Sequence, residues 1–252
     1  MLVQCPNCLK RYRLNPGQAK LLRVRCRGCG SEFLVAPTPD SRHEVAGNGV
    51  HSKALVADIQ RDFRNQIVQI LHSQKFHLYV VEDGEAALAV AREQNPRLLL
   101  VNPYLPKLMG TELIQVLRRE KAVSSTVILL GAIHNRRRYR RRPESLYGAD
   151  DYLDEGLDEA TILKKLEYHL QQPLSPDALP SGTDLEGMRL ARSVFTDLLV
   201  YDPDRMARVK STDDFFRLFA EEAAEGNRYI ESRRPGAGAL LRQVVRHYLA
   251  RA

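Results

Sequence analysis

The sequence predicts an α/β domain whose five-stranded parallel sheet is covered on both faces by helices. A small cysteine module precedes this domain and an all-α module follows it. Three observations support the prediction. Between residues 53 and 172, short apolar runs alternate with segments of helical periodicity. All four cysteines lie before residue 30, in two pairs of identical spacing. From residue 184 onward the chain carries helix start signals and apolar helix faces.

Turn-forming residues separate these parts. Pro, Gly and polar residues are concentrated in two stretches that contain few apolar residues. The predicted organisation is a cysteine module over 1–35, a linker over 36–52, the α/β domain over 53–172, a second linker over 173–183 and the helical module over 184–252.

The positive charge of the chain is unevenly distributed. The net charge of +7 comes from 38 Lys and Arg against 31 Asp and Glu. Residues 1–36 carry seven basic residues and one acidic residue, whereas residues 173–252 carry twelve of each. This distribution argues against a uniformly basic nucleic-acid-binding coat. No apolar run approaches the roughly 18 residues that span a bilayer, and the N-terminus lacks a signal-peptide pattern. We therefore expect a cytoplasmic protein without a transmembrane segment.

The cysteines form two CxxC turns separated by 17 residues. Each tight turn lets two thiolates reach one ion, so Cys5, Cys8, Cys26 and Cys29 predict a tetrahedral Zn²⁺ site with one ion per chain. Four protein ligands leave no position for a substrate, so the role of the zinc is structural. A segment of this size buries too little surface to fold unaided, and metal binding supplies the missing stability.

Further residues around the cysteines carry a family resemblance. They are Cys5-Pro6-x-Cys8, Tyr12, Val24-Arg25-Cys26-x-x-Cys29-Gly30 and Phe33. The segment resembles the short zinc-ribbon domain at the N-termini of many bacterial regulatory and envelope-associated proteins. An iron site or a dithiol redox pair are the alternatives. Such ribbons bind nucleic acid in some families and protein in others, and the spacing does not distinguish the two.

The α/β domain is predicted element by element. Its strands are expected at 54–57, 77–81, 98–101, 127–130 and 151–153, and its helices near 60–73, 84–94, 110–120, 143–147 and 157–170. Strands that alternate with helices in this way are typical of a parallel sheet.

Several motifs in this domain resemble the receiver domain of two-component response regulators. They are Glu82-Asp83-Gly84-Glu85-Ala86-Ala87-Leu88, Asn95-Pro96-Arg97-Leu98-Leu99-Leu100-Val101, Leu105-Pro106-x-x-x-Gly110 and Gly148-Ala149-Asp150-Asp151-Tyr152-Leu153. The resemblance covers nearly the whole domain and implies the flavodoxin-like, doubly wound receiver fold.

The resemblance also implies that the phosphorylation chemistry of receivers is lost. Asn102 aligns with the carboxylate nucleophile of receivers, and Asp58 and Ile59 align with the acidic pair that holds Mg²⁺. Gly131 aligns with the Ser or Thr that senses the phosphoryl group. Glu155 aligns with the Lys that neutralises the charge of that group. An amide is a poor nucleophile, and Mg²⁺ prefers carboxylate oxygens. We therefore expect a degenerate pocket without Mg²⁺ and without phosphotransfer.

A run of arginines follows the fourth predicted strand. Its members are Arg136, Arg137, Arg138, Arg140, Arg141 and Arg142. Pro143 disfavours a helix through the run, so we expect a loop at the carboxyl edge of the sheet, near Asn102 and Gly131. Guanidinium groups bind carboxylate and phosphate. The readings left open are a solvated loop, a site for an acidic protein surface, and a site for nucleic acid or anionic lipid.

The C-terminal module is predicted as four helices. A capping box at Thr183-x-x-Glu186 begins the first, Pro203 the second and Ser211-x-x-Asp214 the third, and the fourth follows Pro235-Gly236-Ala237-Gly238. Their apolar faces predict a docking or dimerisation module.

Together these patterns predict a non-enzymatic signalling or adaptor protein that acts through protein–protein contacts. No catalytic residues are assigned, because no nucleophile, histidine cluster or phosphate loop has a specific spacing. Protein partners are expected, as is a homodimer through the receiver or the C-terminal helices. The alternative is a nucleic-acid-binding transcriptional regulator that uses the zinc ribbon and Arg136–Arg142. The neutral tail, which has no basic helix-turn-helix face, argues against it.

Overall fold

The computed structural model describes residues 2–4, 11–13, 22–28, 32–35, 43–45, 52–120, 126–131, 143, 145–174 and 182–250. The chain forms two compact units, Met1–Ala132 (unit 1) and Ile133–Ala252 (unit 2).

Unit 1 contains the first four of the five predicted parallel strands. They are β6 (Lys53–Ala57), β7 (His77–Val81), β8 (Leu98–Val101) and β9 (Thr126–Leu130), and they run in the spatial order β9-β8-β6-β7. All residues of β8 and β9 are buried, as are all but the first of β6 and β7. Continuous apolar runs are typical of parallel strands that are covered on both faces, so the sequence locates these strands well.

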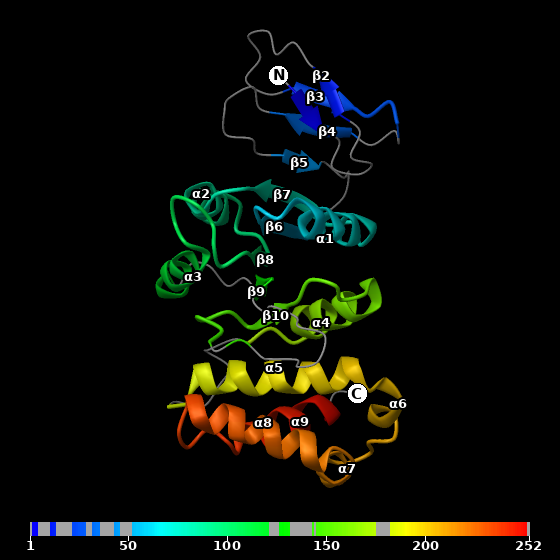
Figure 1. Ribbon diagram of the computed structural model, residues 1–252, viewed down its shortest axis with the longest axis vertical. Coiled ribbons are helices and arrows are strands. Elements are labelled where there is room, and N and C mark those ends of the chain that lie inside the picture. Colours follow the sequence, from blue (N-terminus) through cyan, green and yellow to red (C-terminus); the bar gives the residue numbers. More distant parts are fainter. Residues whose placement is uncertain are drawn as a thin grey trace. The chain divides into compact units, whose positions relative to one another are not determined.

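In the described part of unit 1, three helices cover this sheet. They are α1 (Arg61–Ser73), α2 (Gly84–Gln94) and α3 (Gly110–Arg119), with α2 and α3 together on one side and α1 on the other (Figure 1). The Asp83 carboxylate caps α2 by accepting from the Ala86 N–H at 2.8 Å. Asn95 ends α2 in the left-handed conformation, with φ of 43°.

Among the residues that the structure describes before β6, five short strands are present. β1 (Leu2–Gln4) and β2 (Arg11–Arg13) pair with each other, and β3 (Leu22–Arg25), β4 (Glu32–Val35) and β5 (His43–Val45) form an antiparallel series. Strand β5 pairs antiparallel with β7, where His43 lies opposite Val80. The segment predicted as a linker, 36–52, therefore contains a strand. Its single apolar residue within β5, Val45, is too weak a pattern to predict one.

Unit 2 combines the end of the α/β pattern with the C-terminal helices. Its elements are β10 (Asp151–Leu153), α4 (Glu159–Gln171), α5 (Leu185–Tyr201), α6 (Pro203–Met206), α7 (Thr212–Leu218), α8 (Ala220–Arg233) and α9 (Leu240–Leu249). The predicted boundaries at 172 and 184 fall inside this compact unit. Helix α5 packs against β10, α4, α6, α8 and α9, and every residue from 187 to 200 is buried.

The helix starts agree closely with the predicted signals. Pro203 is the first residue of α6, and the Ser211 hydroxyl caps α7 by accepting from the Asp214 N–H. At α5 the cap is Asp184 rather than Thr183, because the Asp184 carboxylate accepts from the Gly187 N–H at 3.1 Å. A carboxylate is an equally good cap, so the N-cap lies one residue later than predicted, and Gly187 has no side chain to complete a capping box.

The helix predicted near 143–147 is wrong. Of this stretch the structure describes residues 143 and 145–147, and none of them is helical. Tyr147 and Gly148 both have positive φ, of 51° and 87°. Two consecutive residues in this conformation make a turn, and the apolar residue there, Leu146, is buried without a helix.

Candidate functional site

The carboxyl edge of the unit 1 sheet holds a buried carboxylate–amide pair. Asp58 follows β6 and Asn102 follows the neighbouring strand β8. The Asn102 side-chain amide donates to Asp58 Oδ1 at 2.7 Å, and the Asn102 backbone N–H donates to the Ala57 carbonyl at 2.8 Å. The exposed fractions are 0% for Asp58 and 4% for Asn102. Burial raises the pKa of Asp58, although hydrogen bonds from the Gln60 N–H and from Asn102 oppose the rise.

An arginine side chain lies directly beside this pair. The Arg64 guanidinium on α1 donates to the Asp58 carbonyl and to Glu82 Oε1, both at 2.7 Å. Asp58, Arg64 and Glu82 thus carry one positive and two negative charges when both carboxyl groups are ionised. In the described part of the chain, no three His, Cys, Asp or Glu side chains are grouped so that they could hold a metal ion. The absence of Mg²⁺ stays a prediction.

The other residues predicted for the degenerate pocket are placed less closely. Ile59 follows Asp58 and is 46% exposed. Gly131 follows β9 at the same edge of the sheet, with φ of 60°, and offers no hydroxyl. Glu155 follows β10 in unit 2 and is exposed. The structure thus brings Asp58 and Asn102 into contact and leaves Ile59 and Gly131 at the same sheet edge.

The arginine run and most of the zinc site lie outside the described residues. This applies to Arg136–Arg142 and to Cys5, Cys8 and Cys29. Cys26 is described and is 2% exposed. Its sulfur accepts a hydrogen bond from the Gly28 N–H at 3.3 Å. This hydrogen bond closes a turn within the second CxxC motif.

Sequence reasoning missed a buried charge cluster in unit 2. It consists of Asp151, Lys165, His169 and Asp197, which come from β10, α4 and α5. Lys165 Nζ lies 3.3 Å from Asp151 Oδ1 and 3.0 Å from Asp197 Oδ1. The Tyr152 hydroxyl donates to Asp197 Oδ2 at 2.8 Å. All these residues are at most 4% exposed, so the ion pairs join the α/β pattern to the first C-terminal helix away from water.

The tautomer of His169 follows from its two partners. Its Nε2 lies 2.9 Å from Asp151 Oδ2, and its Nδ1 lies 3.3 Å from the Arg192 guanidinium. Because a guanidinium only donates, Nδ1 accepts and Nε2 carries the hydrogen that Asp151 accepts. The Thr196 hydroxyl also donates to Asp151 Oδ2, at 2.7 Å. The charge of Asp151 is therefore satisfied from three sides.

The protonation states of the cluster follow from burial and from these contacts. Burial alone would lower the pKa of Lys165, but Asp151 and Asp197 overcome this effect and raise it. Burial would likewise raise the pKa of Asp151, and Lys165 and His169 lower it. Burial lowers the pKa of His169, so the imidazole is neutral at pH 7. Lys165 is therefore a cation, Asp151 is ionised, and Tyr152 is a neutral donor because burial and the nearby carboxylates raise the pKa of its hydroxyl.

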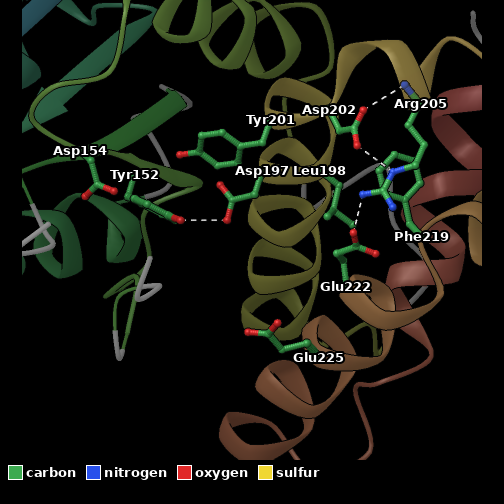
Figure 2. A pocket seen from close by; sticks show the side chains of 10 residues that line it. All are labelled: Tyr152, Asp154, Asp197, Leu198, Tyr201, Asp202, Arg205, Phe219, Glu222 and Glu225. Atoms are coloured by element: carbon green, nitrogen blue, oxygen red, sulfur yellow. Dashed lines mark hydrogen bonds and ion pairs between the residues drawn. The ribbon is translucent and has the colours of Figure 1, made fainter. Parts of the chain in front are cut away.

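A pocket of about 310 Å³ opens beside the cluster within unit 2. Figure 2 shows the residues that line it, which are Tyr152, Asp154, Asp197, Leu198, Tyr201, Asp202, Arg205, Phe219, Glu222 and Glu225. Arg205 lies over the Phe219 ring, 4.3 Å from its centroid, and pairs with Asp202 at 2.8 Å and with Glu222 (Figure 2). These contacts fix one wall of the pocket by joining α6 to α8.

Among the helices that the structure describes, none is long and apolar enough to cross a membrane.

Comparisons with known proteins agree with the receiver motifs. A family model described as the response regulator receiver domain matches residues 54–167. The "DNA-binding response regulator MtrA" of Mycobacterium tuberculosis is 26% identical over 123 residues, which cover 49% of this chain and 52% of that protein. A response regulator receiver protein of an Anaeromyxobacter species is 35% identical over 65 residues, 26% of this chain and 27% of that protein.

Solved structures with receiver domains are also similar. The receiver domain of a sensor histidine kinase from Pseudomonas aeruginosa is 22% identical to this chain, with a TM-score of 0.42. The matched region covers 48% of this chain and 99% of the kinase receiver domain. The chain spans about half the length of MtrA, because the matched region covers 52% of that protein. The match over 54–167 begins in β6 and ends in α4, and it confirms the predicted receiver fold of this part, apart from the helix expected near 143–147. The chain therefore contains a response regulator receiver domain.

Proposed function

We propose that this chain is a non-enzymatic signalling adaptor whose receiver domain does not accept phosphate and acts through protein–protein contacts. The observation that supports this most directly is the hydrogen bond from the Asn102 amide to Asp58. Phosphotransfer needs a carboxylate oxygen that attacks the phosphoryl group. Here the side chain after β8 is an amide, is nearly inaccessible, and is already engaged as a donor.

The remaining positions support the same proposal. Ile59 offers no oxygen to a cation, and Gly131 offers no hydroxyl to a phosphoryl group. An aspartyl phosphate needs a positive charge nearby, whereas the side chain of Glu155 is negatively charged. Arg64 supplies a fixed positive charge beside Asp58.

We expect that acetyl phosphate with Mg²⁺ does not label the protein, because the aligned nucleophile is an amide. Intact-mass spectrometry measures the outcome directly. Asn102→Asp should also stay unlabelled, because Ile59, Gly131 and Glu155 are unchanged. A stable mass gain of one phosphoryl group on the wild-type chain, lost in Asn102→Ala, would contradict the proposal.

The N-terminal segment is proposed as a structural zinc ribbon with one Zn²⁺ per chain. The buried Cys26 sulfur and its hydrogen bond from Gly28 support a thiolate at this position, since an N–H donor favours the charged form. We expect elemental analysis to find about one zinc per chain, and Cys8→Ser to lose it, because three thiolates do not complete the tetrahedron. Asn7→Ser, in the same turn, should keep the metal. Iron in place of zinc, or no metal, would refute the site.

A second candidate function is a nucleic-acid-binding transcriptional regulator. It is favoured by the six arginines of Arg136–Arg142 and by the name of MtrA, which is a DNA-binding response regulator. We place it second because residues 173–252 carry no net charge. For the adaptor we propose a cytoplasmic location and protein partners, and we propose a homodimer through the receiver or the C-terminal helices.

A salt series separates the two functions. The adaptor proposal expects weak duplex binding at about 150 mM salt and little change when Arg137, Arg140 and Arg141 are replaced by Ala. A nucleic-acid regulator should instead bind tightly, and the variant should flatten the slope of log K against log salt by about two to three units. The matched control replaces three exposed cations of unit 2, Arg208, Lys210 and Arg228, with the same change in charge. Submicromolar duplex binding that only the arginine-run variant loses would favour the second function.

A further inference from the structure

The pocket of unit 2 has an acidic lining, and we call it the acidic pocket (Figure 2). Five of its lining residues have a carboxyl side chain, and one, Arg205, carries a positive charge. The carboxyl groups come from the loop after β10, from the C-terminal end of α5 and from α8. Asp154, Asp197 and Leu198 are at most 8% exposed, whereas Glu225 is exposed, so the pocket has a buried floor and an open rim. This lining argues against an anionic ligand and favours a cation.

Cations of the protein balance only part of this negative charge. The Lys165 ammonium group, which belongs to the buried charge cluster, lies 3.0 Å from Asp197 Oδ1. The Arg205 guanidinium pairs with Asp202 at 2.8 Å and with Glu222. Three carboxylates of the pocket therefore share two protein cations.

Glu225 adds a further carboxylate, and it is accessible from the rim. It lies on α8 three residues after Glu222, so the two side chains lie on the same face of the helix. In the described part of the chain, its side chain forms no ion pair and no hydrogen bond. The rim of the acidic pocket therefore offers a negative charge that a ligand can neutralise.

Aromatic rings of the lining already bind cations of the protein. Lys165 Nζ lies 4.1 Å from the centroid of the Tyr152 ring, and the Arg205 guanidinium lies 4.3 Å from that of Phe219. The face of an aromatic ring attracts a cation because its π electrons make it negative. Each of these two cations therefore has both a ring and a carboxylate as neighbours. Tyr201 contributes a third ring to the lining, so a ligand meets the same combination of groups (Figure 2).

The spacing of the carboxyl groups and the size of the pocket specify the kind of cation. A metal ion needs several oxygen ligands within about 2.0–2.6 Å of one point. In the described part of the chain, no three acidic, His or Cys side chains are grouped closely enough for this. The lining therefore suits a cation whose charges are spread along a chain. The volume of about 310 Å³ has room for about ten non-hydrogen atoms, at about 30 Å³ for each water-sized group.

We propose that the acidic pocket is a binding site for a small aliphatic polyamine. One ammonium group binds the carboxylates of Glu222 and Glu225 on α8, and a second binds Asp154 on the wall formed by the loop after β10. The methylene groups between them contact Leu198 and the Tyr201 ring, which are the apolar part of the lining. A ligand bound in this way contacts α5, α8 and the loop after β10 at once and stabilises unit 2. The site is separate from the receiver pocket and does not depend on the adaptor function.

Equilibrium dialysis of the full-length chain against the triamine spermidine, at about 150 mM salt, tests the proposal. We expect a dissociation constant below about 1 mM, and binding at least about tenfold weaker for the monoamine butylamine, which lacks a second charge. Glu225→Lys places a cation at the rim and should weaken spermidine binding about tenfold or more. Glu221→Lys, the matched control, makes the same change in charge at an exposed position of α8 outside the pocket and should bind as the wild type does. Both positions are exposed, so the thermal midpoints without spermidine should stay close to that of the wild type.

Several outcomes would overturn the polyamine site. A dissociation constant above about 1 mM, or binding that Glu225→Lys leaves unchanged, would do so directly. An equal loss in Glu221→Lys, or displacement of spermidine by an equal concentration of Mg²⁺, would show general attraction to an acidic surface. A trilysine peptide that binds the pocket more tightly than spermidine would assign it to a basic protein segment instead. The phosphodonor experiment concerns other residues, so a labelled chain would refute the adaptor function and leave the polyamine site standing.

Discussion

Replacing Lys165 by Met should lower the free energy of unfolding of unit 2 by about 3–5 kcal/mol. Lys165 is the only cation within hydrogen-bond distance of both Asp151 and Asp197 in the described structure, and its side chain is 1% exposed. Methionine fills a similar volume but leaves two carboxylates in a site without their counterion. Urea denaturation followed by far-UV circular dichroism, with hydrogen exchange of the α5 amides, measures the loss.

The neighbouring residue provides the control for this substitution. Lys164 lies on the same helix and is exposed, so Lys164→Met should change the stability by less than about 0.5 kcal/mol. The loss in Lys165→Met should shrink as the pH falls towards about 5, because the pKa values of the uncompensated carboxyl groups rise and protonation removes their charge. If Lys165→Met were as stable as Lys164→Met at pH 7, the cluster would not hold unit 2 together.

Asn102→Asp should destabilise the receiver by about 2–4 kcal/mol at neutral pH. The change places a second carboxylate 2.7 Å from Asp58 Oδ1 at a site that is almost fully buried. Two carboxyl groups in such contact cannot both ionise, so the pKa of one of them rises by about two to three units, at 1.36 kcal/mol each. The folded state then binds a proton that the unfolded state releases, and the stability falls as the pH rises from about 4 to the raised pKa.

The pair offers its own control, because the two groups can be exchanged. The double variant Asp58→Asn with Asn102→Asp again has one amide and one carboxylate and should recover most of the loss at neutral pH. Thermal melts of the single and double variants between about pH 5 and 8 measure both effects. A single variant with unchanged stability, or a double variant no better than the single, would show that the contact is not formed.

The sequence predicted the receiver strands closely because buried parallel strands have a strong pattern. Residues 77–81, 98–101 and 151–153 are strands with the predicted bounds, and the other two differ by one residue. The motifs predicted that Asp58 and Asn102 follow neighbouring strands of one parallel sheet, but not the hydrogen bond between their side chains. The strand β5 and the turn at Tyr147–Gly148 were not foreseen, because both depend on local backbone conformation rather than on an apolar run.

The buried charge cluster could not be predicted by the same reasoning. Arg192, Thr196 and Asp197 form a polar stripe on α5, and a polar stripe on an amphipathic helix ordinarily faces water. Lys165 and His169 lie four residues apart on α4, which is equally typical of an exposed face. Only the close approach of the two helices turns both stripes inward. One feature of the sequence could have indicated the burial of α5: its apolar face is unusually broad and lies beside the polar stripe.

A helix enclosed on every side also constrains how such a gene can be rearranged. A recombination event between residues 173 and 183 would move α5–α9 behind a foreign domain and expose Arg192, Thr196 and Asp197 without their partners. It would equally leave Asp151 and Lys165 in the remaining receiver without theirs. Each half would then contain buried polar groups whose hydrogen-bond partners are in the other half. Transfer of the C-terminal helices to another protein therefore requires that β10 and α4 are transferred with them.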